Sequence, residues 1–312
     1  MSVQYIVGRL AQAIPVVVLV VALTFLMIHL VPGNPARTIL GPRASSSSVR
    51  ALDKQMGLDA PLPLQLSHYF GHVARGDLGS SVINQVPVSQ LVRDRLGATL
   101  LLIAYAAVLA VAITIPLAAL AALRRNGLFD HAIRIVPILG LGIPSFWLAL
   151  MLILYLGIRT GWFPAGGYGS GLLGHLRALF LPGLTVALSI IPFTIRSLRA
   201  SMIEVLESDY VAAARARGIG GWWVLWHHAL RNALLPVVVI FGLNIGWLVG
   251  STLIVERIFA LPGIGALLID SILGRDFPAV QGLTLVVALL VVSVNVATDL
   301  MRAALDPRIR RT

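Results

Sequence analysis

The stretch LGATLLLIAYAAVLAVAITIPLAALAAL, residues 96–123, decides the fold class of this chain. It contains no Asp, Glu, Lys or Arg, and it exceeds the roughly 20 mainly apolar residues that an α-helix needs to cross a bilayer. Five further uncharged stretches meet or approach that length: 10–36, 135–158, 178–195, 232–255 and 277–298. We therefore predict an all-α integral membrane protein with six transmembrane helices.

The composition of the whole chain supports this class and excludes others. Of the 312 residues, 58% are hydrophobic and 12% are charged, whereas soluble domains carry about 25% charged residues. The absence of cysteine excludes disulfides, thiolate catalysis and cysteine-ligated metal sites. The first apolar run is longer than the roughly 7–15 residues of a signal peptide and lacks a small-residue cleavage site, so we predict an uncleaved helix.

The distribution of arginine predicts the orientation in the membrane. The formal net charge is +11, and short cytoplasmic loops of membrane proteins carry an excess of Lys and Arg. Arginines are denser after the second and fourth apolar stretches and in the C-terminal tail than in the other short loops. Because six helices place both termini on one side, we predict cytoplasmic termini. Membrane topology and anionic headgroups explain the charge better than nucleic acid, since the arginines flank apolar runs.

The same pattern divides the chain into three parts. Residues 1–31 form the N-terminal transmembrane helix, and residues 32–95, rich in Pro, Gly and Ser, form an external segment. Residues 96–312 form a five-helix core with a cytoplasmic loop at about 200–232. Prolines inside or near several helices have two interpretations, ordinary curvature of membrane helices or hinges on which the bundle rocks.

A polar segment at 209–236, DYVAAARARGIGGWWVLWHHALRNALLP, carries the signals of a short capped helix. Ser208 is a suitable N-cap, Asp209 lies in the first turn, and Gly218 follows the last turn. Alanines at 212–214 combine strong helix propensity with little bulk. Such a slim helix either docks in a cleft of another protein or lies flat on the headgroups, and these residues alone leave both possibilities open.

Motifs for enzymatic or metal chemistry are missing from the sequence. Adjacent His227 and His228 point about 100° apart on a helix, and no third ligand lies at helical spacing. The single lysine, Lys54, follows no glycine-rich run, which excludes a phosphate-binding loop for ATP. We predict that the chain is not an enzyme and binds no metal or cofactor itself.

Small residues form a regular pattern in the fifth apolar stretch. Gly242, Gly246 and Gly250 form two overlapping G-x-x-x-G units, which place all three near one helix face and permit close approach of another helix. This face has two interpretations: static packing, or packing beside a pathway or a partner helix. Asn244 either lines a polar cavity or bonds a neighbouring helix.

The segment at 209–236 resembles the cytoplasmic loop of the permease subunits of binding-protein-dependent ABC importers. That loop carries Glu-Ala-Ala, three residues, Gly, nine residues and Ile-x-Leu-Pro. With Gly218 as the glycine, Ala213 and Ala214 match the alanines and Leu230 matches the leucine. The sequence departs from the pattern at three positions, which are Ala212 for Glu, His228 for Ile and Arg231 for Pro.

Collinear stretches narrow the resemblance to the di-/oligopeptide/nickel permease group, first-permease or "B" type. They comprise the loop itself, MGLDAPLPLQ with RGDLGSS in the external segment, VERIFALPGIGALLIDSILGRDFPAVQG at 255–282, and LDPRIR at 305–310. The resemblance implies the type I ABC importer permease fold in the plasma membrane of a prokaryote. It implies import of peptides, nickel chelates, glutathione or another small ligand. A self-contained secondary transporter is disfavoured, because intramembrane charges and an evident duplication are lacking.

The resemblance also implies partners and site residues. The partners are a second homologous permease, two ATPase subunits that bind ATP and Mg, and an external solute-binding protein. The residues expected to couple to the ATPase are Asp209, Tyr210, Ala213, Ala214, Arg215, Arg217, Gly218 and His228. Those expected to meet the binding protein are Glu256, Pro262, Gly263 and Asp276.

Overall fold

A computed structural model describes residues 3–30, 35–41, 43–55, 59–224, 226, 230 and 244–305. These residues are mostly helical, and among them the only β-type pairing is an isolated antiparallel bridge between Ser80 and Pro87. The elements are α1 (Val3–Leu30), α2 (Pro35–Leu40), α3 (Ser46–Gln55), α4 (Leu62–Ala74), α5 (Val88–Leu123), α6 (Leu128–Leu141), α7 (Ser145–Leu152), η1 (Ile153–Arg159), α8 (Gly171–Ala178), α9 (Phe180–Leu206), α10 (Asp209–Ala216), α11 (Gly221–Val224), α13 (Ile245–Ile258), α14 (Ile264–Leu273) and α15 (Phe277–Leu305).

Three described helices, α5, α9 and α15, are long and apolar enough to cross a membrane. They correspond to the second, fourth and sixth predicted spans. The apolar helices at Ala11–Leu26 and Ser145–Arg159 are shorter. Much of the fifth predicted span lies outside the described residues, and its end appears in α13. The helical class is thus confirmed, while the count of six spans stays a prediction.

The third predicted span, 135–158, is interrupted. α6 ends at Leu141, and Pro144 adopts an extended backbone before α7 begins at Ser145. Proline lacks an N–H and disfavours a helical residue before it, which favours the break at this point. The second piece then passes from α7 directly into the π-helix η1. Four other prolines remain inside helices, at positions 15, 116, 137 and 192.

The largest core forms where α5 lies against α9. It contains Leu102, Ala106 and Ala110 of α5 together with Ala187 and Ile190 of α9. A Cβ atom at position 183 would collide with the ring of Tyr105, so the glycine there permits close approach of the two helices.

The same two helices are also linked by a buried polar contact. The hydroxyls of Thr114 and Thr194 are 2.9 Å apart and form a hydrogen bond between the helices. Buried hydroxyls need a partner, which fixes the register of the pair. α5 and α9 therefore form one packed unit.

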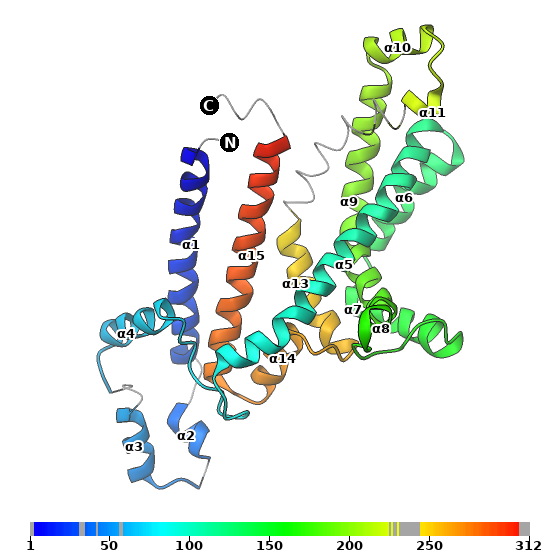
Figure 1. The fold of residues 1–312 in the computed structure, drawn as a ribbon. Helices are drawn as coiled ribbons and strands as arrows, with labels where there is room; N and C mark the ends of the chain where they lie inside the picture. The colour runs from blue at the N-terminus through cyan, green and yellow to red at the C-terminus, as the bar shows by residue number, and fades with distance from the viewer. Residues whose placement is uncertain are drawn as a thin grey trace.

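α1 and α15 form a second pair, which lies apart from α9 in Figure 1. Arg9 of α1 makes an ion pair with Asp299 of α15 at 3.3 Å. α1 begins and α15 ends at the end of the molecule that carries α10, whereas α2, α3, α4 and α14 lie toward the opposite end. Which side of the membrane each end faces stays a prediction.

Gly265 in α14 lies so close to α13 that it has no room for a side chain. A Cβ atom there would strike the backbone of Leu253 and the carboxylate of Glu256. We predict that Gly265→Ala lowers the melting temperature of the purified protein in detergent, because overpacking costs about 1–3 kcal/mol.

Gly250→Ala is the matched control for this prediction. Gly250 is also helical but has open space around its Cβ position, where alanine should add about 0.5–1 kcal/mol of stability. An unchanged or raised melting temperature for Gly265→Ala would contradict the packing of α14 on α13.

Candidate functional site

α10 is the helix that the sequence predicts at 209–217. The carbonyl of Ser208 accepts hydrogen bonds from the amides of Val211 and Ala212, at 3.0 and 3.1 Å, so Ser208 occupies the predicted N-cap position. Its hydroxyl, however, donates to the carbonyl of Val205 in α9. The side chain therefore joins α9 to α10 at their corner and makes no capping hydrogen bond to the described amides of α10.

Gly218 ends α10 as predicted. It has φ +80°, in the left-handed region that favours glycine. The amide of Ile219 donates to the carbonyl of Ala214 at 3.3 Å, which is the long hydrogen bond of a Schellman termination. The Ile219 side chain also packs against the small cluster beneath the helix. The glycine therefore turns the chain sharply toward α11.

α10 has one buried face and one exposed face. Val211, Ala214 and Val224 of α11 form a buried cluster, against which Val205, Leu206 and Ile219 also pack. The exposed face carries five of the predicted coupling residues, which are Asp209, Tyr210, Ala213, Arg217 and Gly218. Ala214 is 4% exposed and therefore belongs to the buried side.

Two predicted coupling positions cannot be placed on either face. His228 and the side chain of Arg215 lie outside the described residues. In Figure 1, α10 stands at one extremity of the molecule, beyond the ends of α6 and α9. Its exposed face is therefore open to a second protein.

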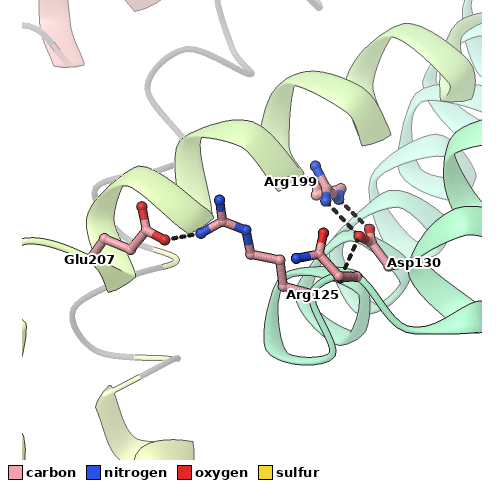
Figure 2. Close-up of polar contacts among 5 residues, drawn as sticks. Arg125, Asp130, Arg199 and Glu207 are labelled. Atoms are coloured by element: carbon pink, nitrogen blue, oxygen red, sulfur yellow. Dashed lines mark hydrogen bonds and ion pairs between the residues drawn. The ribbon is translucent and has the colours of Figure 1, made fainter.

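Two ion pairs, here called the α9 clamp, join the α10 end of α9 to the turn between α5 and α6 (Figure 2). Arg199 of α9 donates two hydrogen bonds to Asp130 of α6, one of them 2.6 Å from Nη2 to Oδ2. The amide of Asn126 also donates to Asp130, at 3.0 Å. Arg125 pairs with Glu207, the residue that follows α9.

The two pairs of the α9 clamp differ in burial. The side chain of Asp130 is 0% exposed and that of Arg199 is 15% exposed. The Arg125–Glu207 pair, by contrast, is 50% and 61% exposed. Buried pairs are strongly destabilised when one partner is removed, whereas exposed pairs contribute little. The Asp130–Arg199 pair is therefore the stronger constraint.

The hydrogen bond from Arg199 holds the pKa of Asp130 below its usual value, although desolvation opposes it. Asp130 precedes the apolar stretch that begins at residue 135. A carboxyl with a lowered pKa contributes stability above its unfolded pKa, and this stability is lost as pH falls through the folded value. The pair is therefore ionised and intact at neutral pH.

The small residues of α13 line a cavity. Gly246 and Gly250 contribute to a space of about 750 Å³ between α6, α7, α9 and α13, together with Ser189, Trp247 and Ser251. The break between α6 and α7 forms part of the same wall. Two other residues are predicted to pack against a helix or to line a pathway. Asn244 lies just before α13, and Gly242 lies outside the described residues.

Glu256 fixes the corner between α13 and α14 at the other end of the molecule. Its carboxylate accepts hydrogen bonds from the amides of Gly265 and Ala266, at 2.7 and 3.2 Å, in the first turn of α14. A negative charge is favourable at a helix N-terminus. A side chain at Gly263 would collide with this carboxylate, which explains the glycine.

Asp276 joins the external segment to the turn before α15. It accepts hydrogen bonds from the Ser81 hydroxyl and from the amides of Val82 and Ile83, at 3.1 and 3.2 Å. The amide of Ala279 donates to it as well, at 3.3 Å. This buried carboxylate therefore holds together two segments that are about 195 residues apart in the sequence.

The predicted contacts with a binding protein divide by burial. Glu256, Gly263 and Asp276 are buried, whereas Pro262 is exposed. The buried carboxylates shape the backbone of this surface, and Pro262 is the member of the set that can touch another protein directly. The contact itself stays a prediction.

These features divide the molecule into two ends joined by the helices of the core. One end carries an exposed helix fixed to α9, the other carries loops fixed by two buried carboxylates, and a cavity lies between them. Within the described ranges, no group of three His, Asp or Glu side chains could hold a metal ion.

Comparison with known proteins gives the class of this chain. Residues 114–311 match the family described as "Binding-protein-dependent transport system inner membrane component", and residues 2–104 match the corresponding N-terminal family. The chain therefore belongs to the inner membrane components of binding-protein-dependent transport systems. The resemblance predicted from the loop motif is confirmed.

Individual relatives are similar along nearly their whole length. The chain is 41% identical over 312 residues to a Brucella abortus protein named as a peptide transport system permease. The alignment covers 98% of each of the two chains. It is 37% identical over 309 residues to a Sinorhizobium fredii protein named as a peptide ABC transporter permease, covering 98% of this chain and 99% of the relative. It is also 37% identical over 306 residues to the glutathione transport system permease protein GsiC of Salmonella typhimurium, covering 98% of each.

We predict that Asp130→Asn destabilises the protein more than Arg125→Gln. The first change leaves Arg199 without its counter-charge, a loss of about 3 kcal/mol, whereas an exposed pair contributes less than about 1 kcal/mol. Thermal unfolding in detergent measures both. The difference in melting temperature between the unmodified protein and Asp130→Asn should shrink at acidic pH, because protonation of Asp130 weakens the same pair in the unmodified protein. Equal melting temperatures at neutral pH would contradict this account.

We also predict that Asp276→Asn frees the backbone of the external segment. Hydrogen exchange at the Val82 and Ile83 amides should become at least about tenfold faster, because these partly buried donors lose a charged acceptor. Asp270→Asn is the control, since its ion pair with Arg257 is about half exposed. Unchanged exchange at both amides would show that Asp276 does not hold this segment.

Proposed function

We propose that this chain is the permease subunit of an ABC importer and forms, with a second homologous permease, a translocation pathway for peptides or similar small solutes. The observation that carries the proposal is α10, an exposed, slim, glycine-terminated helix fixed to α9 in a chain of this family. Relatives named for peptide and for glutathione transport support short peptides as the solute class, glutathione being itself a tripeptide.

In the proposed arrangement the chain crosses a prokaryotic plasma membrane six times, with both termini in the cytoplasm. The end that carries α10 faces the cytoplasm, and the end with α2, α3, α4 and α14 faces outward. The density of arginine around α10 supports this orientation. The chain divides into the N-terminal helix at 1–31, an external segment at 32–95 and a core at 96–312.

We propose that two separate ATPase subunits, which bind ATP and Mg, bind the cytoplasmic loops of the two permeases, and that a groove of the ATPase holds the exposed face of α10. Asp209, Tyr210, Ala213, Arg217 and Gly218 lie on that face. The small side chain of Ala213 lets the backbone of α10 approach the groove closely. This chain supplies no ATP site of its own.

Movement of α10 would pass into the membrane through α9. The Val211–Ala214–Val224 cluster and the Ser208 hydroxyl fix α10 to the end of α9. The α9 clamp extends the connection to α6, and the Thr114–Thr194 hydrogen bond extends it to α5. The three helices would then rock together, with the α6–α7 break as a point of bending.

The cavity beside α13 is the proposed wall of the pathway. Gly246 and Gly250 leave room for solute, and the hydroxyls of Ser189 and Ser251 can exchange hydrogen bonds with peptide groups. The second permease would close the other side. At the outer end, a solute-binding protein would dock near Pro262, on a surface held by Glu256, Gly263 and Asp276.

We predict that Ala213→Arg lowers co-purification of the ATPase subunits and peptide uptake at least tenfold, a change of about 1.4 kcal/mol or more. A long side chain on the exposed face of α10 would prevent close docking without disturbing the buried cluster. Ala74→Arg is the matched control, because Ala74 is an exposed helical alanine at the other end of the molecule.

Two results would contradict the proposed function. One is normal ATPase binding and peptide uptake by Ala213→Arg with an unchanged melting temperature. The other is uptake by the purified chain alone, driven by an ion gradient, which would indicate a self-contained secondary transporter.

A further inference from the structure

A second cavity, of about 410 Å³, lies between α5, α6, α7 and α9 and shares Ser145 and Ser189 with the wall of the first cavity. Its walls are mainly apolar and include Leu117, Ile133, Val136, Pro192 and Ile195. The Val136 side chain is 64% exposed, so the cavity borders the outer surface of the chain and is not part of its core. It extends to Phe129 in the first turn of α6, close to the α9 clamp.

Two arginines lie one helical turn from the α9 clamp, next in sequence to residues of this cavity but not among those that line it. α6 and α9 run in opposite directions and meet at Asp130 and Arg199. Arg134 follows Asp130 by four residues, and Arg196 precedes Arg199 by three, so both share a helix face with their clamp residue. Both positions adjoin cavity residues, Ile133 on α6 and Ile195 on α9.

The charges at this place are unbalanced. Asp130 is neutralised by Arg199, which leaves Arg134 and Arg196 as two surplus positive charges. Both side chains are exposed, and neither makes an ion pair with another residue in the part of the chain that the structure describes. An apolar cavity open to the surface, with two exposed arginines next in sequence to its lining residues, is complementary to an acyl chain attached to a phosphate.

We propose that this cavity binds an anionic phospholipid of the cytoplasmic leaflet. One acyl chain occupies the space between α5, α6 and α9, and Arg134 and Arg196 bind the headgroup phosphate. Guanidinium groups match phosphate geometry well, and basic pockets between transmembrane helices on the cytoplasmic side bind such headgroups. The apolar walls favour a lipid over free phosphate, and the surplus positive charge favours it over an apolar helix of the second permease.

The lipid site rests on the proposed orientation in the membrane but not on transport or ATP hydrolysis. Bound lipid can be counted on the purified permease whether or not it imports peptides. Failure of the lipid test therefore leaves the proposed function standing, and failure of the ATPase or uptake test leaves the lipid site standing.

The test uses the purified permease with its co-purifying subunits in nanodiscs of phosphatidylcholine, with and without phosphatidylglycerol. Native mass spectrometry then counts the phosphatidylglycerol retained per permease. Loss of two arginines, each contributing about a fivefold factor near an anionic surface, predicts about thirtyfold weaker retention in the double variant Arg134→Gln/Arg196→Gln. The control is Arg159→Gln/Arg177→Gln, which removes two exposed arginines at the opposite end and should retain lipid normally.

A second arm identifies the occupant directly. Val136→Cys should cross-link to a thiol-reactive phosphatidylglycerol, and excess inorganic phosphate should not prevent it. Equal retention by the double variant and the control would overturn the proposal. Cross-linking of Val136→Cys to the second permease in place of lipid would overturn it as well.

Discussion

The position of α10 depends on one buried ion pair, Asp130 with Arg199. α10 is only eight residues long and protrudes from the bundle, so its direction is set by the helix that carries it. That helix, α9, is held near its end by a carboxylate that is fully buried and bound through two hydrogen bonds. Without the pair, the attachment of α9 to α6 would loosen, whereas the packing of α9 on α5 and the Thr114–Thr194 hydrogen bond would remain.

The two ends of the molecule use buried carboxylates in related ways. Asp130 joins two long helices, Glu256 joins α13 to the first turn of α14, and Asp276 joins the external segment to the start of α15. Asp130 and Asp276 bind groups that are distant in the sequence, whereas Glu256 binds amides 9 and 10 residues further along the chain. Asp130 and Asp276 each accept several hydrogen bonds in place of water, as a buried charge requires, whereas Glu256 accepts its two amide hydrogen bonds through one oxygen and its other oxygen has no hydrogen-bond partner among the described residues. The surfaces proposed to meet other proteins are thus held by charges that those proteins do not touch.

Local features of this fold follow from the sequence, and its long-range contacts do not. The apolar runs predict α5, α9 and α15, and Gly218 predicts the end of α10, because length, hydropathy and backbone preference act over a few residues. Asp130 and Arg199 are 69 residues apart and carry no local signal that pairs them. Asp276 and Glu256 stand out in the sequence by resemblance, but their burial is visible only once distant segments are placed. Pro144 signals a break, yet only the packing of α7 on α9 and α13 shows that the broken helix lines a cavity.

We propose that the Asp130–Arg199 pair transmits movement between α10 and the membrane helices. The most direct measurement is solute uptake per ATP hydrolysed, in proteoliposomes that contain the complete importer. The account predicts that Asp130→Asn keeps its ATPase subunits and hydrolyses ATP but imports less solute per ATP. The double variant Asp130→Arg/Arg199→Asp, which exchanges the two charges, should import more solute per ATP than Asp130→Asn does. An unchanged ratio for Asp130→Asn would contradict the account.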